Sequence, residues 1–456
     1  MKRQVLMCAP FNTRSGYGDH ARSIFYSIMD REDFEIKCVD VRWGETPRNH
    51  LDPKIPKHKR LLDTFVDGKN IQQPDIYIDI RIPNEFQTPA KFNIGITAGV
   101  ETDVVSPEFI VGCNQMNLNL ATSKFTAGNF QRCAYDQTKE VNGQQQVVGQ
   151  VKLERPMGVL SEGIDTTIYK PIKDAGKSDD PFKKQIYDMI DESFVFLHVG
   201  QWGKGGYGED RKNIAVMIKT FLQAFANQPN PPALLLKTNG ADFSHLDKAD
   251  TIKKIQVEKE KFKSVDSLPN IYLLHGDLTL EQMALLYNLP KVKAMLSCTH
   301  GEGFGRPLAE ATCCDLPVIA TGWSGQMDFL NPKQSTLIEG KLQSVPKSLI
   351  WKPIIVEPSK WFCADEGDII RKLRFFKKNH KKLKHQAKIL GQVNRGKHSL
   401  EAMKKEFNKI LDNVVSQIPE TPKPVSLKLP KLKKKTESKL PMKSAKIKLP
   451  KLKKVT

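Results

Sequence analysis

Two glutamates, Glu302 and Glu310, flank a glycine-rich segment in the second half of the chain. The segment reads Gly-Glu-Gly-Phe-Gly at residues 301–305, and it lies between a short apolar run at 292–296 and Pro307. Pro307 suits the first turn of a helix because its backbone angle is already helical. A strand, a glycine loop and a helix N-terminus in this order present unpaired N–H groups and the positive end of a helix dipole. The sequence therefore predicts a phosphate-type anion site at this loop.

A carboxylate beside a phosphate is repulsive, so the two glutamates suggest a second kind of ligand group. Helical side chains lean toward the N-terminus, and Glu310, one turn into the predicted helix, can therefore reach the ligand side of the loop. A carboxylate there is best used to accept hydrogen bonds from neutral hydroxyls, such as a ribose diol or a sugar ring. The alternative is that Glu310 only complements the helix dipole and Glu302 is an ordinary loop residue.

The pair resembles the paired-glutamate motif of retaining GT-B glycosyltransferases, and most closely that of glycosyltransferase family 4. Seven residues separate the two glutamates, and Gly-Phe-Gly follows the first. In that family the first glutamate and the following amides contact the donor sugar, and the second binds the ribose. The resemblance therefore implies a catalytic role for Glu302 and donor-binding roles for Gly303, Phe304, Gly305 and Glu310.

A second stretch follows the apolar run 194–199 and supplies cations. The family shows Gly-Arg after this strand and a lysine that opens the next helix, and both cations neutralise the leaving diphosphate. Lys212 fits the lysine, but Gln201 stands where the arginine is expected. We expect Arg211 to substitute for it, delivered by the glycine-rich insert at 200–208. The alternative is that Arg211 and Lys212 form a solvated helix start.

Two stretches in the first half correspond to the opposite side of a cleft. Gly16 and Gly18 follow the first predicted strand, where a glycine loop in the family lets the backbone approach the donor diphosphate or the acceptor. Family members often carry an acceptor-contacting histidine or acid near residues 97–103. This sequence offers Glu101 and Asp103 there and no histidine, and Glu101 is equally consistent with a solvated loop acid.

The predicted fold class is α/β, because short apolar strands alternate with helical patterns along most of the chain. The resemblance implies a GT-B arrangement of two Rossmann-like parallel-sheet domains facing a cleft, with the glycine-rich loops at the carboxyl ends of strands. We expect an N-terminal, acceptor-side domain at 1–165, a linker at 166–192, a nucleotide-sugar-binding domain at 193–395 and a helix crossing back at 396–416. A polar stretch at 137–150 is expected to be an exposed loop, and residues 351–356 to be a strand.

The remaining residues, 417–456, are rich in lysine and proline and are expected to be disordered. Residues 421–456 contain 13 Lys and one Glu, which is +12 of the formal net charge of +20. A Lys-Leu-Pro unit recurs along them, as at 428–430 and 448–450. DNA or another polyanion is a candidate partner of this tail. The alternative is a tail that only aids solubility.

Composition limits the remaining possibilities. The chain has 456 residues, with no apolar run near the roughly 20 residues that span a bilayer. Its eight cysteines are scattered and show no metal-type pairs, which is consistent with reduced residues in a cytoplasmic protein. No Asp-x-Asp stretch or His/Cys cluster indicates a metal. The implied co-substrate is a nucleotide diphosphate sugar, and no further cofactor is expected.

The function implied by the resemblance is a retaining glycosyltransferase of the hexosyltransferase type, acting on an acceptor that the sequence does not identify. One alternative is a DNA-modifying glycosyltransferase that uses the tail to hold DNA. Another is a non-catalytic protein that binds sugar nucleotides or nucleic acid. Gln201 and the missing histidine favour the non-catalytic alternative, whereas the glutamate pair and Lys212 oppose it.

Overall fold

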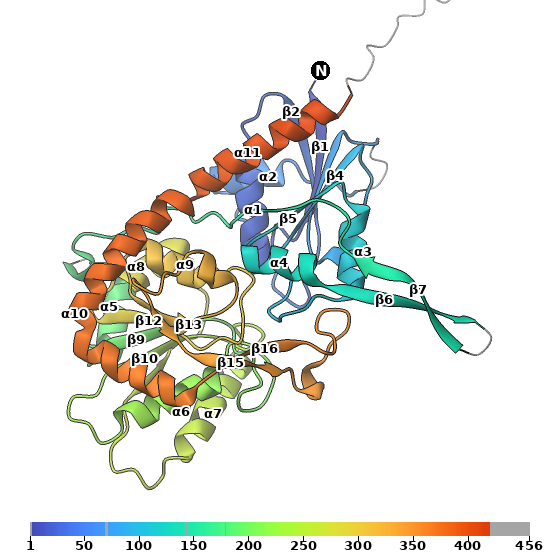
Figure 1. The fold of residues 1–456 in the computed structure, drawn as a ribbon. Helices are drawn as coiled ribbons and strands as arrows, with labels where there is room; N and C mark the ends of the chain where they lie inside the picture. The colour runs from blue at the N-terminus through green and yellow to red at the C-terminus, as the bar shows by residue number, and fades with distance from the viewer. Residues whose placement is uncertain (1, 69–71, 142–143, 178, 420–456) are drawn as a thin grey trace, which may run out of the picture. The chain divides into compact units, whose positions relative to one another are not determined.

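The computed structural model describes residues 2–68, 72–141, 144–177 and 179–419. The first half of the chain forms a six-stranded sheet whose neighbouring strands are all parallel (Figure 1). Its strands read as short apolar runs because a parallel sheet is covered on both faces. The spatial order reverses between β1 and β3, which opens a crevice beyond their carboxyl ends. In that order the strands are β2 (Phe34–Asp40), β1 (Arg3–Ala9), β3 (Ile76–Ile80), β4 (Phe92–Thr97), β5 (Leu118–Ala121) and β8 (Met157–Val159).

The second half of the chain forms another six-stranded sheet, also parallel throughout. Its order reverses between β9 and β12, so a second crevice lies beyond the ends of these two strands. Both sheets confirm the predicted α/β class. The strands in spatial order are β11 (Ile271–Leu273), β10 (Ala233–Lys237), β9 (Val195–Val199), β12 (Val292–Ser297), β13 (Val318–Thr321) and β14 (Thr336–Ile338).

Helices connect the parallel strands and cover the sheets (Figure 1). Several begin at a serine, threonine or aspartate whose side chain accepts a backbone N–H of the first turn, as Ser15 does from Gly18 at the start of α1. None of the helices in the described ranges is both long and apolar enough to cross a bilayer. The helices are α1 (Gly16–Ile28), α2 (Pro56–Leu62), α3 (Pro107–Gln115), α4 (Lys124–Arg132), α5 (Pro181–Met189), α6 (Ile214–Phe225), α7 (His245–Glu260), α8 (Leu280–Asn288), α9 (Arg306–Cys313), α10 (Glu366–Lys397) and α11 (Leu400–Gln417).

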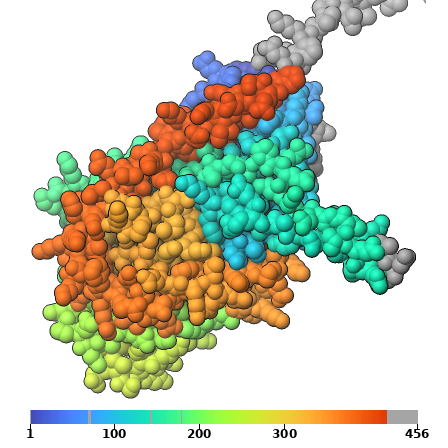
Figure 2. All heavy atoms as spheres, in the orientation of Figure 1, coloured from blue at the N-terminus to red at the C-terminus, as the bar shows by residue number. Residues whose placement is uncertain are grey.

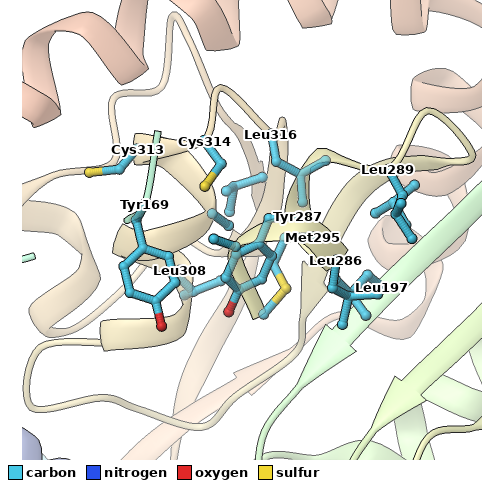
Figure 3. Packing of buried hydrophobic residues seen from close by; sticks show 14 of the residues in the cluster. Tyr169, Leu197, Leu286, Tyr287, Leu289, Met295, Leu308, Cys313, Cys314 and Leu316 are labelled. Carbon is cyan, nitrogen blue, oxygen red and sulfur yellow. The ribbon is translucent and has the colours of Figure 1, made fainter. Parts of the chain in front are cut away.

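The second sheet has a core on each face, and one of them lies directly behind the glycine-rich loop at 301–305. Figure 3 shows this core, in which Leu308 of α9 and Tyr287 of α8 pack with Met295 of β12. Phe182 and Ile186 of α5 belong to the same core, so part of the expected linker 166–192 packs with the second sheet. This packing fixes α8 and α9 against the strand that leads to the loop.

The last two helices belong to different halves of the chain. Helix α10 packs on α6 and α9 beside the second sheet, whereas α11 packs on α1 beside the first (Figure 1). Met403, Phe407 and Leu411 of α11 are buried in the core of the first sheet. The chain therefore returns to its first half after completing the second.

Two expectations about local structure are wrong. Residues 137–141 and 144–150 lie in an antiparallel ribbon, β6 (Ala134–Val141) and β7 (Gln144–Lys152), rather than in a loop. Figures 1 and 2 show this ribbon extending away from the first sheet. The Asn-Gly pair at 142–143 is a strong hairpin signal in the sequence. The polar composition of the strands obscured it, because an exposed ribbon does not need an apolar face.

Residues 351–356 do not form a strand, and only an isolated bridge joins Trp351 to Ile355. Pro353 has no N–H group to donate to a strand pairing. The strands of this region are instead β15 (Gly340–Ser344) and β16 (Lys360–Ala364), which pair antiparallel. The predicted basic tail, residues 421–456, lies outside the described residues.

Replacing Phe407 by alanine should lower the free energy of unfolding by about 3–5 kcal/mol, because the ring is fully buried in the core of the first sheet. Lys409→Ala, at an exposed position of the same helix, is the matched control and should change stability by about 0.5 kcal/mol or less. Denaturant unfolding of the full-length protein measures both. Equal small effects would contradict the packing of α11 on the first sheet.

Candidate functional site

The reversal between β9 and β12 brings two predicted stretches together. The loop after β9 carries Arg211 and Lys212, and the loop after β12 carries Glu302. The ammonium of Lys212 lies 2.5 Å from Oε1 of Glu302, and Nη1 of Arg211 lies 3.5 Å from Oε2. Lys212 and Glu302 are only 9% and 8% exposed, so they form a buried ion pair. The structure thus places the three predicted catalytic residues in one cluster.

The start of α6 holds Lys212 in place. Asp210 is fully buried, and its carboxylate accepts the N–H of Ile214 at 3.0 Å, which caps the helix. Asn213 adopts a left-handed conformation with φ of 55°, which turns the chain sharply after Lys212. Burial raises the pKa of Asp210 to about 6, against the opposing effect of the backbone N–H groups. The lysine therefore stands on a rigid turn.

Charge and burial oppose each other in the Lys212–Glu302 pair. Burial favours the uncharged form of Glu302, but the charges of Lys212 and Arg211 outweigh it and hold its pKa below the usual range. Burial and the charge of Arg211 lower the pKa of Lys212, and Glu302 only partly restores it. A second anion beside Lys212 and Arg211 would favour their charged forms.

Arg211 and Gln201 have different partners in the structure. The Gln201 amide donates to the carbonyl of Gly240 at 2.5 Å. Arg211 also contacts Glu101 of the first half of the chain at 2.9 Å, so the two carboxylates share its guanidinium. The expectation that Arg211 stands in for the missing arginine stays a prediction.

Glu310 has different partners from Glu302 and belongs to a second group of charged residues. Its Oε1 lies 3.2 Å from Nε of Arg306, and its Oε2 accepts the hydroxyl of Tyr287 at 3.3 Å. Burial raises the pKa of Glu310 to about 7, although the charge of Arg306 acts in the opposite direction. The carboxylate is therefore close to its titration point near neutral pH.

Arg306 and Glu162 were missed by the sequence analysis. Nη1 of Arg306 lies 3.3 Å from Oε2 of Glu162, which is on the segment after β8. Burial raises the pKa of Glu162 to about 7 as well, again opposed by Arg306. Burial acts to lower the pKa of Arg306, but the carboxylates of Asp19, Glu310 and Glu162 outweigh it and raise that pKa. For Arg306 the sequence offered one indication of a site role, which is that it directly follows the glycine loop. For Glu162 the local sequence gave no such indication.

The glycine loop contacts the first half of the chain through its backbone. The hydroxyl of Ser123 donates to the carbonyl of Gly303 at 2.5 Å. A Cβ atom at Gly303 would lie 2.5 Å from the carbonyl oxygen of Ala98, and one at Gly301 would meet the carbonyl of Glu101. Glycine is required at both positions by this close approach.

The other predicted residues of the first half have varied surroundings. Asp103 pairs with the backbone of Lys360, accepting its N–H at 2.6 Å and donating to its carbonyl at 2.9 Å. Its carboxylate is therefore committed to the β15–β16 ribbon. Gly18 lies in a tight turn, where a Cβ would be 2.5 Å from the carbonyl oxygen of Thr13, whereas Gly16 has open space. Asp19, in the first turn of α1, pairs with Arg22, and its charge also acts on Arg306.

Backbone donors complete the site. Gly305 has φ of 94° and precedes the first residue of α9. Among the residues that the structure describes, no protein acceptor is recorded for the N–H groups of Gly303, Phe304 and Gly305. These donors lie at the positive end of α9, next to Lys212 and its neighbours in the loop. The arrangement can bind an anion beside carboxylates that accept hydroxyl groups.

Solved structures share this architecture. The Anabaena protein HepE in complex with UDP-glucose matches with a TM-score of 0.58 at 14% identity, over 90% of this chain and 100% of that one. Sucrose-phosphate synthase from Thermosynechococcus elongatus matches with a TM-score of 0.60 at 11% identity, over 91% and 100% of the two chains. A UDP-forming α,α-trehalose-phosphate synthase from Burkholderia xenovorans gives 0.55 at 9% identity, over 91% and 100%.

By sequence, no family model matches the chain and no curated protein matches it. The likeness is therefore one of fold, and it extends over both parallel sheets and the returning helix. Two six-stranded parallel sheets that meet at their carboxyl ends, matched over at least 90% of the chain, give this protein the GT-B fold of glycosyltransferases.

Proposed function

We propose that the protein is a retaining glycosyltransferase that moves a sugar from a nucleotide diphosphate sugar to an acceptor. The observation that carries this proposal is the cluster that Lys212 and Arg211, just before α6, form with Glu302, just before α9. The N–H groups of 303–305, which have no protein acceptor among the described residues, follow Glu302 directly. The donors and cations suit a diphosphate, and the carboxylates suit hydroxyl groups. The fold shared with HepE, which was solved with UDP-glucose, adds support.

Each charged group has a role in this proposal. A donor diphosphate replaces Glu302 as the partner of Lys212 and Arg211, which frees the glutamate to accept hydrogen bonds from the sugar. Glu310 accepts the ribose hydroxyls, with Arg306 and Tyr287 fixing its position. Glu101, which approaches from the first half of the chain, lies on the side expected to hold the acceptor. Asp103 is not assigned an acceptor role, because the backbone of Lys360 occupies its carboxylate.

The proposed reaction needs positioning and charge stabilisation more than a protein nucleophile. The bond between sugar C1 and the diphosphate oxygen breaks, and its electron pair stays on the diphosphate. The acceptor oxygen bonds to C1 on the same face, and its proton passes to the departing diphosphate oxygen. Lys212, Arg211 and the loop N–H groups stabilise the charge that grows on that oxygen.

A donor screen tests the proposal directly. UDP-glucose is the first donor to try, because HepE was solved with UDP-glucose and the Burkholderia xenovorans protein is a UDP-forming synthase. Release of nucleotide diphosphate should be followed for UDP, ADP and GDP sugars, with small acceptors and with DNA. NMR of the product should show the anomeric configuration of the donor. Tight donor binding without release under any condition would favour the non-catalytic alternative, and an inverted product would exclude the retaining assignment.

Lys212→Ala should slow transfer by about 10²-fold or more, as expected for loss of a main stabiliser of the developing charge. Arg211→Ala should have a smaller effect because Arg211 is farther from Glu302 and shared with Glu101. Lys219→Ala is the matched control, since Lys219 lies on α6 and pairs with Glu366. Steady-state rates with the identified donor measure all three. Full activity of the Lys212→Ala, Arg211→Ala double variant would place the diphosphate elsewhere.

Glu310→Ala should mainly weaken donor binding, because a ribose contact exists in both the ground state and the transition state. Glu302→Ala should instead lower kcat more than it raises KM, because the sugar contact strengthens during transfer. Calorimetric binding of the donor and steady-state kinetics separate these effects. Unchanged affinity and turnover in both variants would refute the site assignment.

Donor affinity should increase as pH rises through about 7, because the ionised form of Glu310 accepts hydroxyl groups better than the protonated form and its pKa is raised to about 7. Glu310→Gln should remove this dependence. Glu162 has a pKa of about 7 beside the same arginine, so Glu162→Gln is the necessary comparison and should retain the dependence. Donor affinities of the unmodified protein and both variants, measured between pH 6 and 8, show which glutamate causes the pH dependence. A flat profile for the unmodified protein would contradict this role of Glu310.

A further inference from the structure

Helix α10 carries a strongly basic surface that the proposed reaction does not use. Between Ile369 and Lys397 the sequence contains eleven Lys and Arg residues and no Asp or Glu. The buried face of the helix packs on α6 and α9, and the opposite face is exposed (Figure 2). A run of like charges on a solvent-facing helix is repulsive, so a basic surface of this density indicates an anionic partner.

Two of these lysines, Lys381 and Lys384, line a hollow between α10 and the connection from α8 to β12, together with Lys293 of β12. The hollow has a volume of about 380 Å³. Among its described lining residues there is no carboxylate. The basic side chains that line the hollow are those of Lys293, His380, Lys381 and Lys384, and Leu289 and Pro290 lie beside them.

Two of the ammonium groups are fixed in position by the backbone. Lys293 donates to the carbonyl of Pro290 at 2.5 Å, and Lys384 donates to the carbonyl of Asp315 at 2.8 Å. Each ammonium has three N–H donors, so both retain donors for a ligand. The nearby carboxylate of Asp315 already pairs with Arg395 at 2.6 Å. Lys293 and Lys384 therefore have defined positions at the hollow and are not freely moving side chains.

The cations are close enough to disfavour one another's charge. The pKa of His380 is lowered by burial and by the charges of Lys293 and Lys381. The pKa of Lys384 is lowered by burial, with Asp315 acting in the opposite direction and Lys388 and Lys293 adding to the decrease. An anion in the hollow would relieve this repulsion.

We propose that this hollow is a second anion-binding site that takes a phosphate group through Lys293, Lys381 and Lys384, none of which belongs to the proposed donor site. Compact ammonium groups suit phosphate as point charges. The phosphate can belong to a small molecule or to a polymer. A second hollow of about 380 Å³, lined by Arg374, Lys377 and Lys378, lies nearer the start of the same helix and would extend the surface for a polymer.

The test compares two double variants of the full-length protein that lose equal charge. Lys293→Gln with Lys381→Gln removes two cations from the hollow. Lys382→Gln with Lys397→Gln removes two exposed lysines of α10 that line neither hollow. Both variants retain residues 421–456, so any binding by the tail is the same in each. The probes are inorganic pyrophosphate and a duplex DNA of about 20 base pairs, titrated at about 0.15 M salt.

We expect the hollow variant to bind pyrophosphate about tenfold more weakly and the control variant less than about twofold more weakly. The same pattern with DNA alone would identify a polymer as the source of the phosphate and would equally support the site. Equal affinities of the two variants for both probes would overturn the proposal. The Lys212→Ala variant should retain the pyrophosphate signal of the hollow. This result separates the site from the donor site, whether or not the proposed transfer reaction is correct.

Discussion

The buried ion pair between Lys212 and Glu302 is the interaction on which the rest of the site depends. A buried charge without a partner is strongly destabilising, so the loops after β9 and β12 must meet for either residue to be tolerated. The strand order brings these loops side by side at the point where the sheet reverses. The cap supplied by Asp210 and the close packing of Gly303 then determine the orientation of each partner.

The two halves of the chain are joined by charges as well as by backbone contacts. Arg211 contacts Glu101, and Arg306 contacts Glu162. Each of these two arginines of the second half therefore has a carboxylate partner from the first half. The groups around Arg306 include more carboxylates than cations, and burial raises the pKa values of Glu162 and Glu310 to about 7. Small changes in pH or in bound ligand therefore alter the charge of this region.

The sequence predicted the parts of the site that lie within single loops. Glu302, Glu310 and Lys212 stand next to glycine-rich segments whose local pattern is informative, and the parallel sheets follow from alternating strands and helices. The pairing of Arg306 with Glu162 was not predictable in this way, because 144 positions separate the two residues and neither has a local motif. The contact of Asp103 with the backbone of Lys360, a residue of the other half, was not predictable for the same reason.

The sharing of Arg211 between Glu101 and Glu302 has a consequence for ligand exchange. Both carboxylates belong to this chain, so a phosphate that binds Arg211, as proposed, would compete with partners that are already in place. The net affinity for such a phosphate would be lower than its intrinsic affinity for Arg211, because these contacts must first be broken. Because Glu101 belongs to the first half of the chain, the same competition removes one connection between the halves. On the proposed function, binding of a phosphate at Arg211 and loss of its contact with Glu101 would be one event.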